Sequence, residues 1–152
     1  MTTNRYKMHR YINDFILKLC HKYGLSDGFK VKIRTEKHIA DRILDRDFPK
    51  ETFQILMTRM VRFHICEIMY LSLTGVSRIN IYTEDGYMMG ITGKQTPDGF
   101  VIAIRTLYKE RNFGNRKRII DAGVIYTINR DEERTVLPLT EQQKIKYGVI
   151  NG

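Results

Sequence analysis

The segment best suited to chemistry runs from Lys37 to Arg46 and combines a histidine with two arginines at helical spacing. If it folds as a helix, His38 and Arg42 lie on one side, with Arg46 a further turn along, because residues four apart are neighbours on a helix surface. Histidine exchanges a proton near neutral pH, and arginine can hold two phosphate oxygens at once. The spacing therefore indicates a site that handles a phosphate group, with a solvated helix face as the alternative.

A ribonuclease that works without a metal ion needs few groups. A base takes the proton of the 2′-hydroxyl, an acid protonates the leaving 5′-oxygen, and cations stabilise the charged phosphorane between them. His38 and His64 are the candidates for base and acid, and Arg42 and Arg46 are the candidates for the cations. His64 lies in an apolar stretch, so a structural role in the core is the alternative for it.

Other kinds of site find little support in the sequence. The four histidines do not have the spacing of a zinc motif, and the chain contains no Walker loop, no dinucleotide-binding glycine motif and no Gly-x-Ser-x-Gly. The acidic residues closest in sequence, Asp41, Asp45 and Asp47, alternate with arginines and do not form an obvious metal cluster. A metal-dependent nuclease is therefore disfavoured, with convergence of carboxylates distant in the sequence as the alternative.

The overall charge favours a polyanion as partner. The 152 residues include 26 Lys and Arg against 17 Asp and Glu, a net charge of +9. Such a surplus attracts nucleic acid first and an anionic membrane second. No apolar run approaches the ~20 residues of a membrane span, so a nucleic acid is the expected partner and a membrane is not.

Residues 109–118 form the densest basic stretch, and they follow a long apolar run. Because the stretch contains a glycine, a loop is expected. An aromatic ring among the cations can stack on a base while the arginines bind phosphates, and a solvated loop is the alternative. The candidate RNA-binding residues are Lys109, Arg111, Phe113, Arg116, Lys117 and Arg118.

Length and composition predict a single domain over residues 1–152, since 42% of the residues are apolar and 28% are charged. Cys20 and Cys66 both lie in apolar runs and are expected to be reduced core residues of a cytosolic protein. The first residues lack the apolar stretch of a signal peptide. The expected location is therefore the cytoplasm.

The order of the predicted elements indicates an α+β domain. Residues 1–24 contain an amphipathic helix that ends at Gly24. Residues 29–62 contain a short strand, the helix of His38 and a helix that starts near Pro49, and the stretch after Arg62 fits either a helix or a strand. Residues 77–128 predict an antiparallel β-meander, and residues 130–152 a charged tail. We expect N-terminal helices packed on an antiparallel sheet of about four strands.

This order, together with His38-x-x-x-Arg42-x-x-x-Arg46, resembles the RelE-like toxin superfamily. Within it, the chain is most similar to the RegB-type phage endoribonucleases, which cut early messages in their ribosome-binding sequences. The similarity covers about Lys30 to Arg111. It implies a RelE-like fold, a metal-independent RNase without a cofactor, and mRNA as the substrate, with the ribosome or a ribosomal protein as a further partner. Host cytoplasm is the place implied for a phage-encoded protein.

The resemblance also implies roles for single residues. His38 and Arg42 match the catalytic His and Arg of the superfamily, and His64 is the candidate for its second histidine. The carboxylate on the first helix of the family has no clear match here; Asp14 is the nearest. This departure keeps two alternatives open, namely a non-catalytic basic phage protein that binds nucleic acid and one that captures an acidic host or virion protein.

Overall fold

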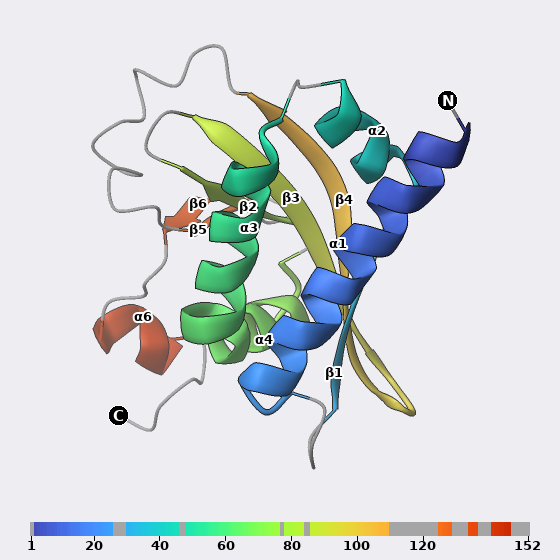
Figure 1. Ribbon diagram of the computed structural model, residues 1–152. Coiled ribbons are helices and arrows are strands. Elements are labelled where there is room, and N and C mark those ends of the chain that lie inside the picture. The colour runs from blue at the N-terminus through green and yellow to red at the C-terminus, as the bar shows by residue number, and fades with distance from the viewer. Residues whose placement is uncertain are drawn as a thin grey trace.

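Helices and a six-stranded sheet make up the structure, a computed structural model that describes residues 2–25, 30–45, 48–76, 78–83, 86–109, 125–128, 134–136 and 141–146 (Figure 1). The helices are α1 (Thr2–Lys22), α2 (His38–Leu44), α3 (Lys50–Arg59), the π-helix η1 (Met60–His64), α4 (Ile65–Leu73) and α6 (Glu141–Lys146). The strands are β1 (Val31–Thr35), β2 (Arg78–Tyr82), β3 (Tyr87–Thr96), β4 (Gly99–Lys109), β5 (Ile125–Ile128) and β6 (Arg134–Val136).

The sheet has the strand order β1-β4-β3-β2-β5-β6. β2, β3 and β4 form the predicted antiparallel meander, and β5 returns beside β2. β1 pairs with β4 in parallel, so the sheet is mixed, and β6 adds an antiparallel strand at the other edge. The prediction of an α+β domain with N-terminal helices packed on a meander sheet is confirmed, whereas the sheet is mixed and six-stranded instead of antiparallel with about four strands. The region predicted as a charged tail, residues 130–152, contributes β6 and α6.

Helix α1 forms because apolar residues recur along one side of an otherwise cationic segment. Ile12, Ile16 and Leu19 are buried on that side, as the spacing of three and four residues requires. The helix ends where predicted: Gly24 has a φ of 74°, and the N–H of Leu25 donates to the carbonyl of Cys20, 2.8 Å away. These features are those of a Schellman motif, which closes a helix with a glycine in the left-handed region.

The stretch that fits both a helix and a strand is helical throughout. α3 continues through η1 into α4 without a break, and Met60, Val61 and Ile65 are buried along it. Phe63, in contrast, is 58% exposed. A π-helix adds one residue to a turn, and here that turn lies between two α-helical segments whose apolar sides both belong to the core.

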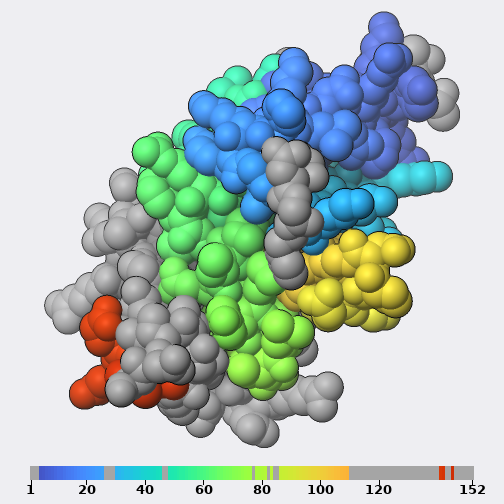
Figure 2. Space-filling model, turned by 90° about the horizontal axis from the view of Figure 1, so that it is seen from below, coloured from blue at the N-terminus to red at the C-terminus, as the bar shows by residue number. Residues whose placement is uncertain are grey.

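Helices α1, α3 and α4 cover one face of the sheet, and α2 lies between α1 and the end of β4 (Figure 1). Seen from below, α1 lies beside α3, and the β3–β4 hairpin projects beyond β1 (Figure 2). A ring contact between Phe15 and Phe53 joins α1 to α3, and a hydrogen bond from Gln54 to the Tyr11 hydroxyl adds a polar link. The helical layer therefore presents an apolar surface to the strands.

Close approach of α4 to β3 depends on the absence of a side chain at Gly93. A Cβ atom there would lie 2.5 Å from Ser72 Oγ and 2.6 Å from Phe100 Cζ, which is closer than non-bonded atoms pack. The Ser72 hydroxyl is buried without a hydrogen-bond partner among the described residues. The glycine thus sets the distance between the helical layer and the sheet.

We predict that Gly93→Ala lowers the free energy of unfolding by about 1–3 kcal/mol, because the added methyl group overpacks this contact. Urea denaturation followed by circular dichroism measures the change. Lys94→Ala on the same strand is the control, since Lys94 is exposed and a surface substitution changes stability by roughly 0.5 kcal/mol or less. Equal stability of the Gly93→Ala variant and the control would contradict the role of Gly93.

The two cysteines differ, and the prediction that both lie in the core is right for Cys20 and wrong for Cys66. Cys20 is buried and Cys66 is exposed. Burial raises the pKa of the Cys20 thiol, because desolvation disfavours the thiolate. The thiolate is the reactive form, so the two side chains should differ in reactivity.

We expect one thiol to react rapidly with Ellman's reagent in the native protein and the second to react only when the protein unfolds. Cys66→Ser should remove the rapid phase and Cys20→Ser should leave it. Two rapid phases of equal amplitude in the wild-type protein would show that the end of α1 opens readily, contrary to its packing.

Within the described part of the chain, none of the helices combines the length and the apolar character that crossing a bilayer requires.

Candidate functional site

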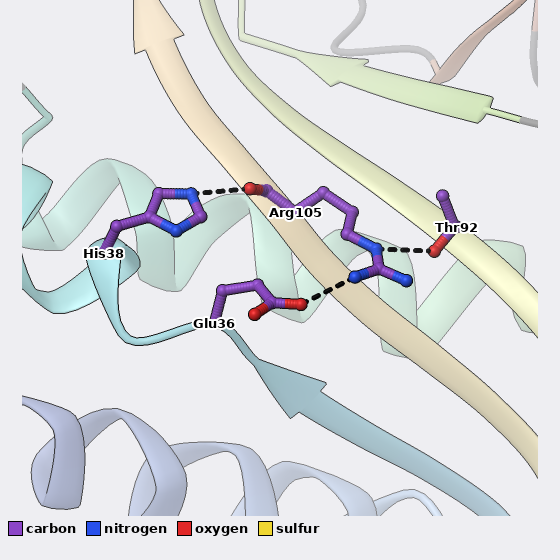
Figure 3. A network of polar contacts seen from close by, with 4 residues as sticks. All are labelled: Glu36, His38, Thr92 and Arg105. Atoms are coloured by element: carbon purple, nitrogen blue, oxygen red, sulfur yellow. Dashed lines mark hydrogen bonds and ion pairs between the residues drawn. The ribbon is translucent and has the colours of Figure 1, made fainter.

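His38 is the first residue of α2 and lies at the junction of α2 with β4. Its ring is exposed, while Ile39, Ala40 and Ile43 on the other side of the same helix are buried. The imidazole Nε2 lies 2.7 Å from the main-chain carbonyl oxygen of Arg105 (Figure 3). The predicted helix therefore exists, and its apolar side anchors it so that the histidine ring reaches the sheet.

This contact decides which ring nitrogen carries a proton. A carbonyl oxygen only accepts hydrogen bonds, so Nε2 is the donor. In the neutral ring the other nitrogen, Nδ1, then has a lone pair that can accept a proton. A main-chain acceptor also holds the ring in one orientation, as a positioned general base requires.

The carbonyl of Arg105 is available because β4 has one extra residue at this point. Gly90 pairs with Thr106 and Ile91 pairs with Ile104, so Arg105 has no partner on β3. Such a bulge redirects the local main chain and side chain. The bulge also accounts for a glycine at position 90, because a Cβ atom there would lie only 2.7 Å from Thr106 Cγ2.

The side chain of Arg105 is held by two neighbours (Figure 3). Its Nη1 lies 2.6 Å from Glu36 Oε1, and its Nε donates to Thr92 Oγ1 at 3.1 Å. Both partners of the ion pair are partly exposed, Arg105 at 46% and Glu36 at 40%, so the pair contributes little to stability. Its effect is to hold the guanidinium between Glu36 and Thr92, while the main-chain carbonyl of the same residue contacts His38.

Arg42 lies one turn beyond His38 on α2 and is exposed. Its position agrees with the predicted spacing, and the side chain makes polar contacts of its own. Arg46 lies outside the described residues. The site as described thus contains one histidine, two arginines and one carboxylate: His38, Arg42, Arg105 and Glu36.

A cationic surface extends from this site across the sheet. Along β1 the side chains alternate, with Val31 and Ile33 buried and Lys32 and Arg34 exposed. The exposed pair therefore lies on the face opposite the core.

The same face continues onto β3, because cross-strand partners share a face. Lys32 and Lys94 both pair with Val101, and Arg34 and Thr92 both pair with Ala103. Thr92 receives the hydrogen bond from Arg105. We call this surface the outer face; its cations on β1, β3 and β4 are Lys32, Arg34, Lys94 and Arg105.

The structure does not bring His64 to His38. His64 ends the π-helix that precedes α4, and α4 lies at the opposite end of the molecule from α2 (Figure 1). It is only 8% exposed, and its Nδ1 lies 3.5 Å from Glu67 Oε1 without forming a hydrogen bond. This placement agrees with the structural alternative for His64 and leaves the site at α2 with His38 as its single histidine.

Of the predicted RNA-binding stretch, only Lys109 falls within the described residues. It is exposed at the end of β4, with its Nζ 4.9 Å from the centre of the Tyr87 ring. The remaining candidates lie outside the described residues; they are Arg111, Phe113, Arg116, Lys117 and Arg118.

A wide groove of about 870 Å³ lies away from His38, between the end of α1, β1 and the β3–β4 turn. Its lining is mainly apolar, with Ile16, Val31 and Phe100 among the side chains, and it contains no histidine. Over the described ranges, no three histidine, cysteine or acidic side chains come close enough together to hold a metal ion.

Sequence reasoning missed Glu36, Thr92 and Arg105. Arg105 had a visible signal, because it is the one charged residue inside the apolar run Phe100–Leu107. A charge in such a strand indicates a bulge or a site. Glu36 and Thr92 had no comparable signal, since their contacts with Arg105 depend on the pairing of β1, β4 and β3.

No family model, curated protein or solved structure matches the chain.

We predict that neutral His38 is protonated at Nε2. Long-range proton–nitrogen NMR above the titration range of the ring should show Nε2 as the N–H nitrogen and Nδ1 as the unprotonated one. The exposed His21 of α1 serves as the comparison ring. A His38 ring protonated at Nδ1 would show that the contact with the Arg105 carbonyl does not form in solution.

Proposed function

We propose that the protein is a metal-independent endoribonuclease that cleaves mRNA at the site around His38. The observation that carries the proposal is the hydrogen bond from His38 to the Arg105 carbonyl at 2.7 Å. It leaves Nδ1 of an exposed, oriented ring as the proton acceptor, with Arg42 one turn further along the same helix and Arg105 on the neighbouring strand. The resemblance of the His38 helix to that of RelE-like ribonucleases supports the same reaction.

In the proposed reaction, Nδ1 of His38 removes the proton of a 2′-hydroxyl, and the 2′-oxygen attacks the adjacent phosphorus. The bond from phosphorus to the 5′-oxygen breaks, and the leaving oxygen takes a proton from water, which reaches this exposed site. The products are a 2′,3′-cyclic phosphate and a 5′-hydroxyl. Arg42 and Arg105 stabilise the negative charge on the phosphorane, as fixed donors do in other phosphoryl reactions.

Recognition of the RNA strand is assigned to the outer face. Lys32 and Lys94 lie on strands two apart, roughly 10 Å from each other across the sheet. Glu36, which follows β1, is paired with Arg105. Lys109 continues the positive charge beyond β4. A flexible polyanion can therefore follow the outer face to His38.

The outer face also favours a second candidate, a protein that binds RNA without cleaving it. Its four cations would serve that function even if His38 does no chemistry. Binding of this kind weakens steeply with salt and survives removal of the histidine. The two candidates therefore differ in one observable, the dependence of cleavage on His38.

We expect site-specific cleavage in EDTA of transcripts with purine-rich ribosome-binding sites. His38→Ala should reduce the rate roughly a hundred- to ten-thousand-fold, as loss of a general base does, and Arg42→Ala roughly a hundred- to a thousand-fold. His21→Ala should cleave like the wild type, because His21 is an exposed histidine of α1 outside the site. The assay is run with and without added ribosomes.

Cleavage by His38→Ala at the wild-type rate would exclude the proposed base. Salt-sensitive RNA binding without cleavage by any variant would select the second candidate. Neither binding nor cleavage would exclude both, and would favour the remaining hypothesis, capture of an acidic host or virion protein.

A further inference from the structure

A second group of basic side chains lies on the other side of α2 from β4. A pocket of about 190 Å³ between the first turns of α1 and the start of α2 is lined by Arg5, Tyr6, His9 and Lys37. None of these four described lining residues is acidic. Asp41 lies beside one of them, with its Oδ1 3.1 Å from Arg5 Nε. The lining thus consists of one aromatic ring and the side chains of an arginine, a histidine and a lysine.

The Arg5 guanidinium is held in place and still has donors to offer. Asp41 contacts Nε, whereas the two Nη groups carry four further N–H donors. A planar guanidinium anchored on one edge can present another edge to a phosphate. Asp41 therefore orients Arg5 toward the pocket, and Lys37 adds a second positive charge.

His9 supplies an observation of a different kind. Its Nδ1 is enclosed, yet it has no hydrogen-bond partner among the described residues. An enclosed polar nitrogen without a partner costs free energy. This atom has almost no accessible surface, so His9 can meet a ligand in the pocket only through the rest of its ring. Tyr6, at the mouth of the pocket, is 66% exposed, so its ring is accessible to a nucleobase.

From this arrangement we propose that the pocket is a second phosphate subsite, which binds a phosphate of the same RNA strand that reaches His38. Lys37 lines the pocket and His38 follows it directly in the chain, so a strand that crosses the first residue of α2 meets both sites. Arg5, His9 and Lys37 contact the phosphate, and Tyr6 stacks on the neighbouring base. The inference rests on the proposed function for the identity of the strand.

The test measures binding rather than cleavage. The probes are a 2′-O-methyl RNA tetranucleotide, which has no 2′-hydroxyl to react, and inorganic phosphate, and the protein is the full chain. Lys37→Ala is compared with Lys7→Ala, which removes the same charge from an exposed position of α1 outside the pocket. Thermal unfolding of both variants confirms that they are folded.

We expect Lys37→Ala to weaken binding of the tetranucleotide about tenfold and to reduce the slope of log Kd against log salt by about 0.7, the value for one phosphate of a single strand. Lys7→Ala should change the affinity by less than about twofold. In the wild type, inorganic phosphate should shift the NMR signals of the Arg5 guanidinium and the His9 ring.

Equal effects of Lys37→Ala and Lys7→Ala, or the absence of phosphate-induced shifts at Arg5 and His9, would overturn the subsite. Shifts with phosphate but no Lys37-dependent RNA binding would also overturn it, since the pocket would then take the free anion only. RNA binding that depends on Lys37, without any cleavage, would support the subsite and contradict the proposed ribonuclease activity. Cleavage that depends on His38, with no effect of Lys37→Ala on RNA binding, would support the enzyme and contradict the subsite.

Discussion

The extra residue in β4 at Arg105 is the feature on which the arrangement around His38 depends. In a regular antiparallel ladder the carbonyl and N–H of each residue are directed to a neighbouring strand. Because Arg105 has no partner on β3, its carbonyl can accept a hydrogen bond from His38 and its side chain can reach Glu36 and Thr92. One irregularity thus connects α2, the end of β1 and two strands of the meander.

One face of the sheet is buried and apolar, and the other is exposed and cationic. Side chains alternate between the two faces along each strand, which separates the two kinds of residue. Ile33, Ile102 and Ile104 belong to the buried core, whereas Lys32 and Arg34 are exposed beside them. A shift of one residue in the β1–β4 pairing would place the cations against the helices, at a large cost in desolvation. The burial of apolar side chains therefore fixes the register that creates the outer face.

The two histidines that were candidates for catalysis, His38 and His64, lie in very different environments. His38 starts an exposed helix next to a main-chain acceptor, and His64 is enclosed beside Glu67 at the end of a π-helix. Either histidine could serve as the base or the acid of a two-histidine ribonuclease, and the apolar neighbours of His64 in the sequence are the signal that distinguishes it from His38. They are separated because His38 begins α2, beside β4, whereas His64 lies where α3 continues through η1 into α4.

The sequence by itself determined the local features of this protein. The spacing of apolar residues and Gly24 defined α1, alternation defined β1 and β2, and the spacing of His38 and Arg42 placed both on one exposed helix. Each of these signals depends only on residues that are close together in the sequence. The parallel pairing of β1 with β4 and the partners of His38 were decided only by the tertiary structure. His38 and Arg105 are 67 residues apart, and a contact over that separation depends on strand order and on a bulge, which leave no periodic trace in the chain.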